Sequence, residues 1–141
     1  MILAFLTFTA ISAVDVPEAT YGHIAIAEGR EVEVVGSTAT EAIVRAYFKD
    51  IPVMIEVARC ESTFRHKLAD GSILQGRVDP ADTGVMQINK RYHEKKAISL
   101  NLNLDTIEDN MAYARYLYDT QGVQPWSASA PCWNRTLAIN L

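Results

Sequence analysis

The chain has 141 residues and a formal net charge of −4, which allows one domain with a sizeable core, or a smaller domain behind an N-terminal tail. Five acidic residues and one arginine within residues 1–39 account for the whole net charge, so residues 40–141 are electrically neutral. A neutral body argues against nucleic acid as a partner, because phosphate binding needs a basic face, and it suits a carbohydrate better.

Residues 1–14 form an apolar run that ends in small residues and resembles the apolar part of a secretory signal peptide. The run lacks a basic start and is short for a membrane span, so it predicts a signal peptide or a truncated anchor. No other segment is long and apolar enough to cross a bilayer. Residues 15–39 predict a spacer or pro-region, and residues 40–141 predict the folded domain. We therefore expect export to the periplasm, to the cell surface or into the medium.

Two helices are predicted at the start of the folded domain. Residues 40–50 predict the first, which Thr40 would cap. The apolar stripe of this helix is expected to run through Ile43, Ala46 and Phe48 or Tyr47. Asp50 would cap the second helix, with Pro52 in its first turn, where a missing N–H does no harm.

Glu61 lies on the apolar side of the second predicted helix. At about 100° per residue it falls within an apolar arc that comprises Met54, Val57, Ala58 and Phe64. Removal from water disfavours the charged carboxylate and raises its pKa, and the negative end of the helix acts in the same direction. The alternative is a glutamate at the edge of the core that reaches solvent or pairs with Arg65.

Residues 65–89 combine many turn signals with two short apolar pieces, residues 73–74 and residues 85–88. They predict a small antiparallel hairpin or a three-strand excursion. Such a unit is too small to fold alone and must pack against the helices. The crease between the two parts is a natural cleft.

Two further helices are predicted beyond the hairpin. Residues 90–97 form a short one, and Asp105 would cap a longer one that ends before Gly122. One face of the longer helix carries Ile107, Met111, Ala114, Leu117 and Tyr118. The segment 124–133 then brings together both tryptophans and the second cysteine.

Cys60 and Cys132 stand 72 positions apart, without a CxxC motif or a histidine at ligand spacing, so we expect neither a metal site nor a cofactor. They are either free buried thiols or one disulfide. A disulfide that closes so long a loop would stabilise the domain by about 4 kcal/mol. His23, His66 and His93 share no ligand spacing and are predicted to be surface histidines.

Four blocks of sequence carry a family resemblance. They are Ala58-Arg-Cys-Glu-Ser-Thr-Phe64, Thr83-Gly-Val-Met-Gln-Ile-Asn89, Asn110-Met-Ala-Tyr-Ala-Arg-Tyr-Leu117 and the tail from Trp126 to Trp133. In this order they resemble the lysozyme-like superfamily, and within it the Slt-type lytic transglycosylases, over roughly residues 40–133. The resemblance implies an α+β, predominantly α fold in which a small antiparallel hairpin forms one wall of a glycan cleft.

The same resemblance implies an enzyme that cleaves the MurNAc–GlcNAc β-1,4 linkages of peptidoglycan, and we expect a monomer. Glu61 would be the general acid/base, and the 6-hydroxyl of the substrate would close a 1,6-anhydro ring. The substrate-binding candidates are Ser62, Met86, Gln87, Asn89, Asn110, Tyr116 and Trp126. Ordinary alternatives exist, since Ser62 is equally placed as a helix-end cap and Trp126 as core packing.

Asp82 is the candidate for a second catalytic carboxylate in an alternative reaction. The block that begins at Asp82 also resembles a strand of animal-type lysozymes, whose aspartate is the nucleophile or stabiliser, and this implies a muramidase that hydrolyses the bond. Asp82 would otherwise be a turn residue bonded to its own backbone, and Asp79 is expected to be only that. A non-catalytic module that binds glycan is a further alternative, and a disulfide-stapled structural module is another.

Two features depart from the transglycosylase pattern. Ala114 stands where the family helix usually has glycine, and the tail from Trp126 to Trp133 replaces a different family block. A cysteine before the glutamate and a second one near a C-terminal tryptophan resemble the resuscitation-promoting-factor branch of the superfamily. That branch implies a disulfide between Cys60 and Cys132.

Overall fold

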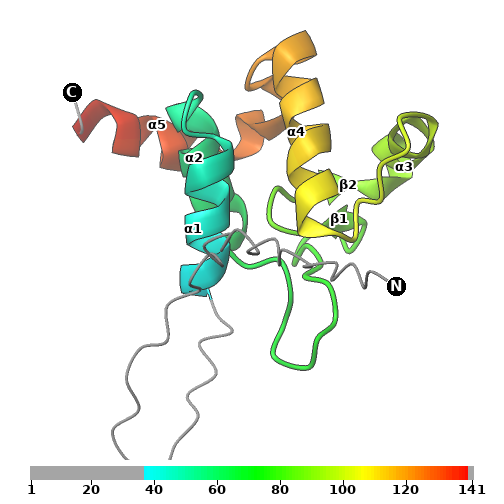
Figure 1. The fold of residues 1–141 in the computed structure, drawn as a ribbon. Coiled ribbons are helices and arrows are strands. Elements are labelled where there is room, and N and C mark those ends of the chain that lie inside the picture. The colour runs from blue at the N-terminus through cyan, green and yellow to red at the C-terminus, as the bar shows by residue number, and fades with distance from the viewer. Residues whose placement is uncertain (1–36, 140–141) are drawn as a thin grey trace, which may run out of the picture. The chain divides into compact units, whose positions relative to one another are not determined.

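The computed structural model describes residues 37–139, and these lie within one compact unit (Figure 1). The predictions for residues 1–14, and for residues 15–36 of the spacer, lie outside the described part. The elements follow in the order α1 (Ser37–Tyr47), α2 (Pro52–Ser62), β1 (Asp82–Thr83), β2 (Ile88–Asn89), α3 (Lys90–Ser99), α4 (Ile107–Gln121), the 3₁₀-helix η1 (Gln124–Ser129) and α5 (Ala130–Ile139). The prediction of a predominantly helical α+β chain with a small antiparallel hairpin is confirmed.

The helix α1 differs from its prediction at its start and on its buried face. It is already helical at Ser37, so Thr40 lies inside the helix and does not cap it. The buried positions are Val44 and Phe48, which are one turn apart, whereas Ile43 is 43% exposed. The predicted stripe is therefore wrong at Ile43 and Ala46, which are exposed, and the buried face runs through Val44 and Phe48.

The helix α2 has Pro52 in its first turn, as predicted, but Asp50 does not cap it. Ile51 takes the N-cap position without a side-chain hydrogen bond, and the carboxylate of Asp50 instead binds the guanidinium group of Arg115 on α4. The buried side of the helix and of the residues just after it is the predicted arc, namely Met54, Val57, Ala58 and Phe64. Thr63 and Phe64 both have positive φ, so the chain turns sharply away from the helix after Ser62.

The helices α3 and α4 form close to their predicted positions, with different caps. Thr106 accepts a hydrogen bond from the Asp109 N–H at 3.3 Å and is the N-cap of α4. Asp105, the predicted cap, instead forms an ion pair with the Lys90 ammonium group at 2.7 Å. Gly122 ends α4 with a positive φ of 62°, as predicted.

The predicted hairpin is present but very short. In β1 and β2, Asp82 lies opposite Asn89 and Thr83 lies opposite Ile88. Two isolated bridges, Lys67 with Ile73 and Gln75 with Thr83, extend the pairing. Residues 85–87, which were expected to belong to a strand, form the connecting turn, because positive φ angles at Gly84 and Gln87 reverse the chain there.

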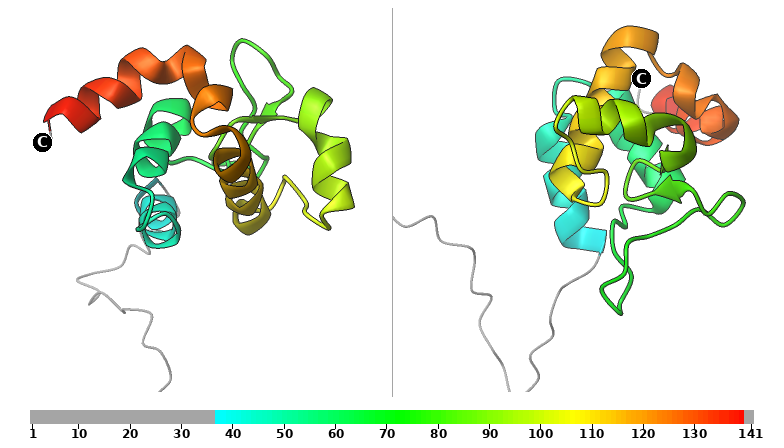
Figure 2. Two further views of the ribbon diagram at one scale, coloured as in Figure 1. Left: turned by 90° about the horizontal axis from the view of Figure 1, so that it is seen from above. Right: turned by 90° about the vertical axis from the view of Figure 1, so that its right-hand side faces the viewer.

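A single apolar core joins the helices to the hairpin. Figure 2 shows α4 lying between α2 on one side and α3 on the other, and η1 and α5 following it back to α2. The helix α2 contacts α1, η1 and α5. The largest fully buried apolar side chains are Tyr113, Phe48, Met54, Met86, Met111, Leu117, Val44, Val57 and Val85. The hairpin turn thus contributes to the same core as the helices.

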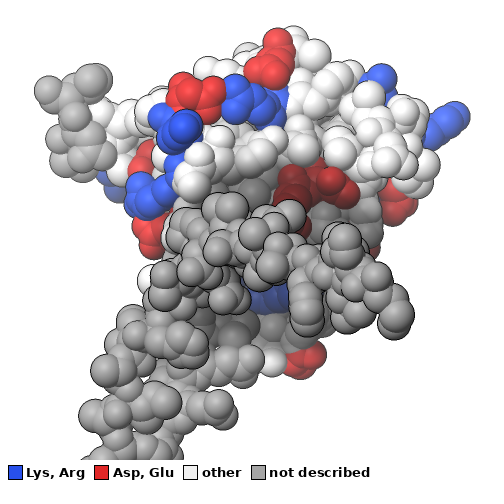
Figure 3. Space-filling model, in the orientation of Figure 1, with Lys and Arg blue, Asp and Glu red and all other residues white. Residues whose placement is uncertain are grey.

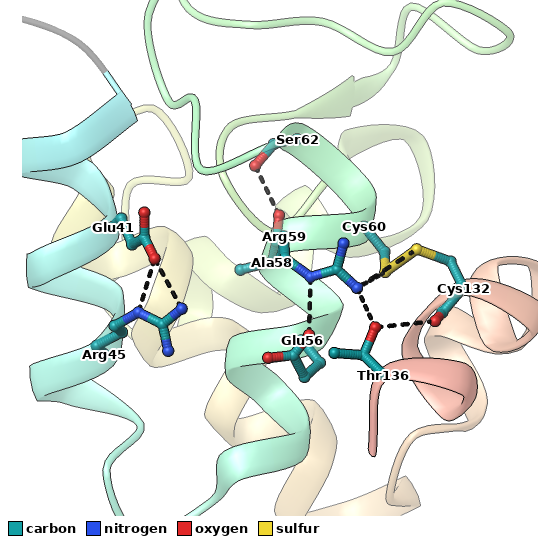
Figure 4. A network of polar contacts seen from close by, with 9 residues as sticks. All are labelled: Glu41, Arg45, Glu56, Ala58, Arg59, Cys60, Ser62, Cys132 and Thr136. Atoms are coloured by element: carbon teal, nitrogen blue, oxygen red, sulfur yellow. Dashed lines mark hydrogen bonds and ion pairs between the residues drawn. A yellow bond between two sulfur atoms is a disulfide. The ribbon is translucent and has the colours of Figure 1, made fainter. Parts of the chain in front are cut away.

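Cys60 on α2 and Cys132 on α5 form a disulfide with a Cα–Cα distance of 6.0 Å (Figure 4). Arg59 lies beside the bond. Its Nε donates to Glu56 Oε2 at 2.8 Å, and its Nη2 donates to the hydroxyl of Thr136 on α5. The bond closes a separation of 72 residues, which corresponds to about 4 kcal/mol of stabilisation from the loss of chain entropy in the unfolded state. The predicted disulfide therefore fixes the end of α2 to the start of α5.

The turn between the two strands, residues 84–87, is held by side chains from distant parts of the chain. The Val85 N–H donates to His66 Nδ1 at 3.2 Å, and the Met86 N–H donates to Asn110 Oδ1 at 3.0 Å. Trp126 Nε1 donates to the Met86 carbonyl at 2.9 Å. Because the turn is buried, these bonds replace those that its backbone would otherwise make to water.

Asn110 uses its whole amide in the same region. Its Nδ2 donates to the carbonyls of Thr83 and Leu104, both at 3.0 Å, while Oδ1 accepts from Met86. Gly84 lies directly against this amide with a φ of +72°. A Cβ at Gly84 would be 2.7 Å from Asn110 Nδ2 and 2.8 Å from His66 Cε1.

Gly84→Ala is therefore expected to lower the free energy of unfolding by about 3 kcal/mol or more, because it combines a strained φ with a clash against buried groups. Gly71→Ala is the matched control, since Gly71 has a φ of +83° and a Cβ added there would meet no atom within 4 Å. The control should lose only about 1 kcal/mol. Chemical denaturation of both variants measures the difference, and equal losses would contradict the packing argument.

Candidate active site

Glu61 lies in the last turn of α2 and is partly buried. Burial raises the pKa of its carboxyl group, the hydroxyl of Ser129 lowers it, and the nearby charge of Asp82 raises it again, with a net upward shift. Ser129 Oγ donates to Glu61 Oε1 at 2.6 Å. Within residues 37–139 no ion pair reaches Glu61, and Arg65 Nε donates instead to the Ser62 carbonyl at 3.0 Å. The alternative pairing with Arg65 is therefore not formed.

Ser129 was not among the residues that the sequence pointed to. It lies at the end of η1, three positions before Cys132, and Glu61 directly follows Cys60. The disulfide therefore brings the two side chains together from opposite ends of a long loop. A disulfide between Cys60 and Cys132 was the available signal, because it would bring Ser129 into the same region as Glu61 without showing that the two side chains bind each other.

Asp82 starts β1 and faces its cross-strand neighbour. Its Oδ1 accepts from Asn89 Nδ2 at 2.7 Å, so its carboxylate binds across the strand pair and not its own backbone. Asp79 accepts from the Ala81 N–H at 3.0 Å, which is the local turn predicted for it, and also from Asn89 Nδ2 at 3.0 Å. The Asn89 side chain therefore orients both carboxylates, and its Oδ1 caps α3 by accepting from the Arg91 N–H.

Four of the predicted substrate-binding residues are buried in this structure. They are Ser62, Met86, Asn110 and Trp126. Asn110 and Trp126 bind the backbone of the 84–87 turn, and Ser62 Oγ donates to the Ala58 carbonyl at 3.0 Å within its own helix. The core alternative is therefore correct for Trp126. Their burial leaves little surface for a ligand in this conformation, and substrate contact by these four residues stays a prediction.

Gln87 and Tyr116 are partly exposed but are also engaged in local contacts. Gln87 Nε2 donates to the Gly84 carbonyl at 2.8 Å and closes its own turn. The ring of Tyr116 on α4 has the Lys96 ammonium 5.5 Å from its centre, so it faces α3. Both side chains are still partly exposed, so contact of Gln87 and Tyr116 with substrate stays a prediction.

The prediction that His66 is a surface residue is wrong. Its side chain is only 4% exposed, Nε2 lies 3.0 Å from the Asp105 carbonyl, and Nδ1 accepts from the Val85 N–H. These partners require the neutral ring with its proton on Nε2. Burial lowers the pKa of His66. His93 is also partly buried, with Nδ1 3.1 Å from the Tyr113 hydroxyl.

The described part of the chain has two notable surface depressions. One, of about 440 Å³, is lined by Leu68, Ser72, Ile73, Gln75, Pro80, Thr83, Lys90 and Asp105. The other, of about 390 Å³, lies over the disulfide and is lined by Arg59, Pro131, Cys132, Arg135 and Thr136. Glu61 lines neither of them, so a glycan cleft at Glu61 stays a prediction.

The charge distribution, the possible metal ligands and the hydropathy of the helices can be stated for the described residues. Figure 3 shows acidic and basic side chains interspersed on one face of the molecule, without a continuous basic surface in the described part of that face. Residues 37–139 contain no group of three histidine, cysteine, aspartate or glutamate side chains arranged to hold a metal ion. None of the helices in this part has both the length and the hydropathy needed to span a bilayer.

Together these features define an α+β domain with a partly buried glutamate that is hydrogen-bonded from the C-terminal segment. Comparison of the chain with protein-family models, with curated proteins and with solved structures finds no match in any of the three. An assignment of function therefore rests on the residues of this chain alone.

His66→Gln should change how stability depends on pH. The pKa of His66 is lower in the folded chain than in the unfolded chain, so the unfolded state takes up a proton first as the pH falls below about 6.5. The contribution of His66 is complete above that pH and is lost as the pH falls toward the folded pKa.

The measurement is urea unfolding of the wild type and His66→Gln between pH 8 and pH 5. The wild type should lose stability relative to the variant as the pH falls, and the contributions of Glu61 and His93 cancel in the difference. A difference that stays constant with pH would contradict the neutral, buried imidazole.

Proposed function

We propose that the chain is a peptidoglycan-cleaving enzyme of lysozyme-like fold, a lytic transglycosylase that acts on MurNAc–GlcNAc β-1,4 linkages. The observation that carries the proposal is the setting of Glu61, whose pKa is raised, chiefly by burial. Ser129 binds Oε1, and no residue among 37–139 donates a hydrogen bond to Oε2. A raised pKa favours the protonated form, and one oxygen without a protein partner can meet the substrate, which are the properties that a general acid requires.

The chemistry follows from that proton. The protonated carboxyl of Glu61 gives its proton to the glycosidic oxygen while positive charge develops on the MurNAc ring, and the bond to the leaving sugar breaks. The N-acetyl group of the substrate stabilises the cation. The Glu61 carboxylate then takes the proton of the 6-hydroxyl, whose oxygen closes the 1,6-anhydro ring, and the acid is regenerated. No second protein carboxylate is needed for this route.

Several features of the chain support this assignment. The glutamate ends a helix that packs in the core, a short hairpin follows it, and a second core helix carries Asn110 against the hairpin turn. This order is the one that the sequence blocks imply for the lysozyme-like superfamily. The disulfide suits an oxidising compartment, which is consistent with export to where peptidoglycan lies.

A muramidase that hydrolyses the same bond is the second candidate, and one observation favours it. The negative charge of Asp82 contributes to the raised pKa of Glu61, so the two carboxyl groups are close enough for their charges to interact. A pair of carboxylates is the usual arrangement in glycoside hydrolases, where the second one supports the sugar cation or activates water. Asp82 is held by Asn89 at 2.7 Å, which would orient it for either role.

Glu61→Gln tests the acid directly. The amide cannot donate a proton to the leaving oxygen, so the release of soluble fragments from purified peptidoglycan should fall by at least about 100-fold. Glu108→Gln is the matched control, because Glu108 is exposed in the first turn of α4, and it should keep full activity. Circular dichroism should show both variants folded.

Full activity of Glu61→Gln would remove the proposal. If the wild-type protein binds peptidoglycan but releases no fragments, the result would support a non-catalytic glycan-binding module instead of an enzyme.

Asp82→Asn, combined with mass spectrometry of the products, separates the two candidates. Transglycosylase products carry 1,6-anhydro ends and are lighter by one water than the products of hydrolysis. The proposal predicts anhydro ends, with a rate for Asp82→Asn within a few-fold of the wild type, because Asn keeps an oxygen to accept from Asn89. Reducing ends, together with a large loss of rate in Asp82→Asn, would establish the muramidase instead.

A further inference from the structure

The hydroxyl of Ser129 is placed between two acceptors. Its Oγ lies 2.6 Å from Glu61 Oε1 and 3.1 Å from the Trp126 carbonyl. A serine hydroxyl has one hydrogen to donate. The shorter contact goes to the group that can carry a full negative charge, and hydrogen bonds to ionised acceptors are the stronger ones. The hydrogen is therefore directed to Glu61.

Ser129 has little freedom to move away from this position. It ends η1, and the next helix is bonded through Cys132 to Cys60, the residue before Glu61. The Trp126 carbonyl that contacts Ser129 also accepts from Trp133 Nε1 at 3.1 Å. These contacts fix the position of Ser129, so its hydroxyl group approaches Glu61 from one direction.

We propose that Ser129 is the positioning residue of Glu61. The Ser129 hydroxyl binds Glu61 Oε1, and Glu61 Oε2 is therefore the oxygen that exchanges the proton with the substrate. The assignment deepens the proposed function and rests on it. When Oε2 carries the proton, Oε1 is a carbonyl oxygen that accepts from Ser129. When the carboxyl is ionised, Oε1 still accepts from Ser129, so the side chain keeps its orientation in both halves of the reaction.

The Ser129 bond has a second consequence that a merely structural contact would lack. It lowers the pKa of Glu61 against the effect of burial. Without it, the carboxyl group would hold its proton to higher pH and would also lose its fixed orientation. Both consequences can be measured separately.

The test compares Ser129→Ala, Ser129→Thr and Ser127→Ala in the full chain. Ser127 is the matched control, because it lies on the same 3₁₀-helix and is exposed. Ser129→Ala should lower kcat on peptidoglycan by about 10- to 100-fold with little change in KM, as expected when a reacting group loses its orientation. Its activity should persist to higher pH, because the general acid keeps its proton longer. Ser129→Thr should restore both properties, and Ser127→Ala should resemble the wild type.

A direct titration keeps the two proposals apart. The ¹³C resonance of the Glu61 carboxyl, assigned by its loss in Glu61→Gln, should titrate at higher pH in Ser129→Ala than in the wild type. An unmoved titration overturns the role of Ser129, whatever the enzyme assay shows. If the wild type releases no fragments, the proposed function fails, and the titration alone then decides whether Ser129 controls Glu61.

Discussion

The buried backbone of the 84–87 turn is the constraint on which most of this structure depends. A buried N–H or C=O without a partner costs about 1–3 kcal/mol, so a turn inside the core must find hydrogen bonds to replace those of water. Three side chains supply them, His66 after α2, Asn110 on α4 and Trp126 on η1. Because these residues come from separate segments, satisfying one turn also fixes how the segments pack against it.

A chain of contacts also connects the 84–87 turn with Glu61, the candidate acid. The indole of Trp126 donates to the Met86 carbonyl, its own carbonyl lies 3.1 Å from Ser129 Oγ, and the Ser129 hydroxyl donates to Glu61. The disulfide fixes the other side of this arrangement by joining Cys60 to α5. Glu61, in the last turn of α2, thus lies against the C-terminal segment. Burial raises the pKa of its carboxyl group, and Ser129 binds one of the two carboxyl oxygens.

Prediction succeeded where a residue's environment follows from its neighbours in sequence. Helical spacing placed Glu61 beside Met54, Val57 and Ala58, and these three are buried. It was less successful for polar residues. Asn110 and Trp126 were predicted to contact substrate, whereas in the structure both are buried and bind the backbone of the 84–87 turn. A sequence block marks a position on an element, whereas the direction in which its side chain points depends on what packs against it.

The sequence by itself determined the four helices α1 to α4, the position of Glu61 in an apolar arc, the end of α4 at Gly122 and the existence of a short hairpin, but not η1 or α5. These features depend on local periodicity, proline and glycine conformation, and turn residues. The tertiary structure alone decided that His66 is buried, that Thr106 caps α4 in place of Asp105, and that Ser129 binds Glu61. The hydrogen bonds of His66 and Ser129 join residues 19 to 68 positions apart, so they exist only after the core has brought the segments together.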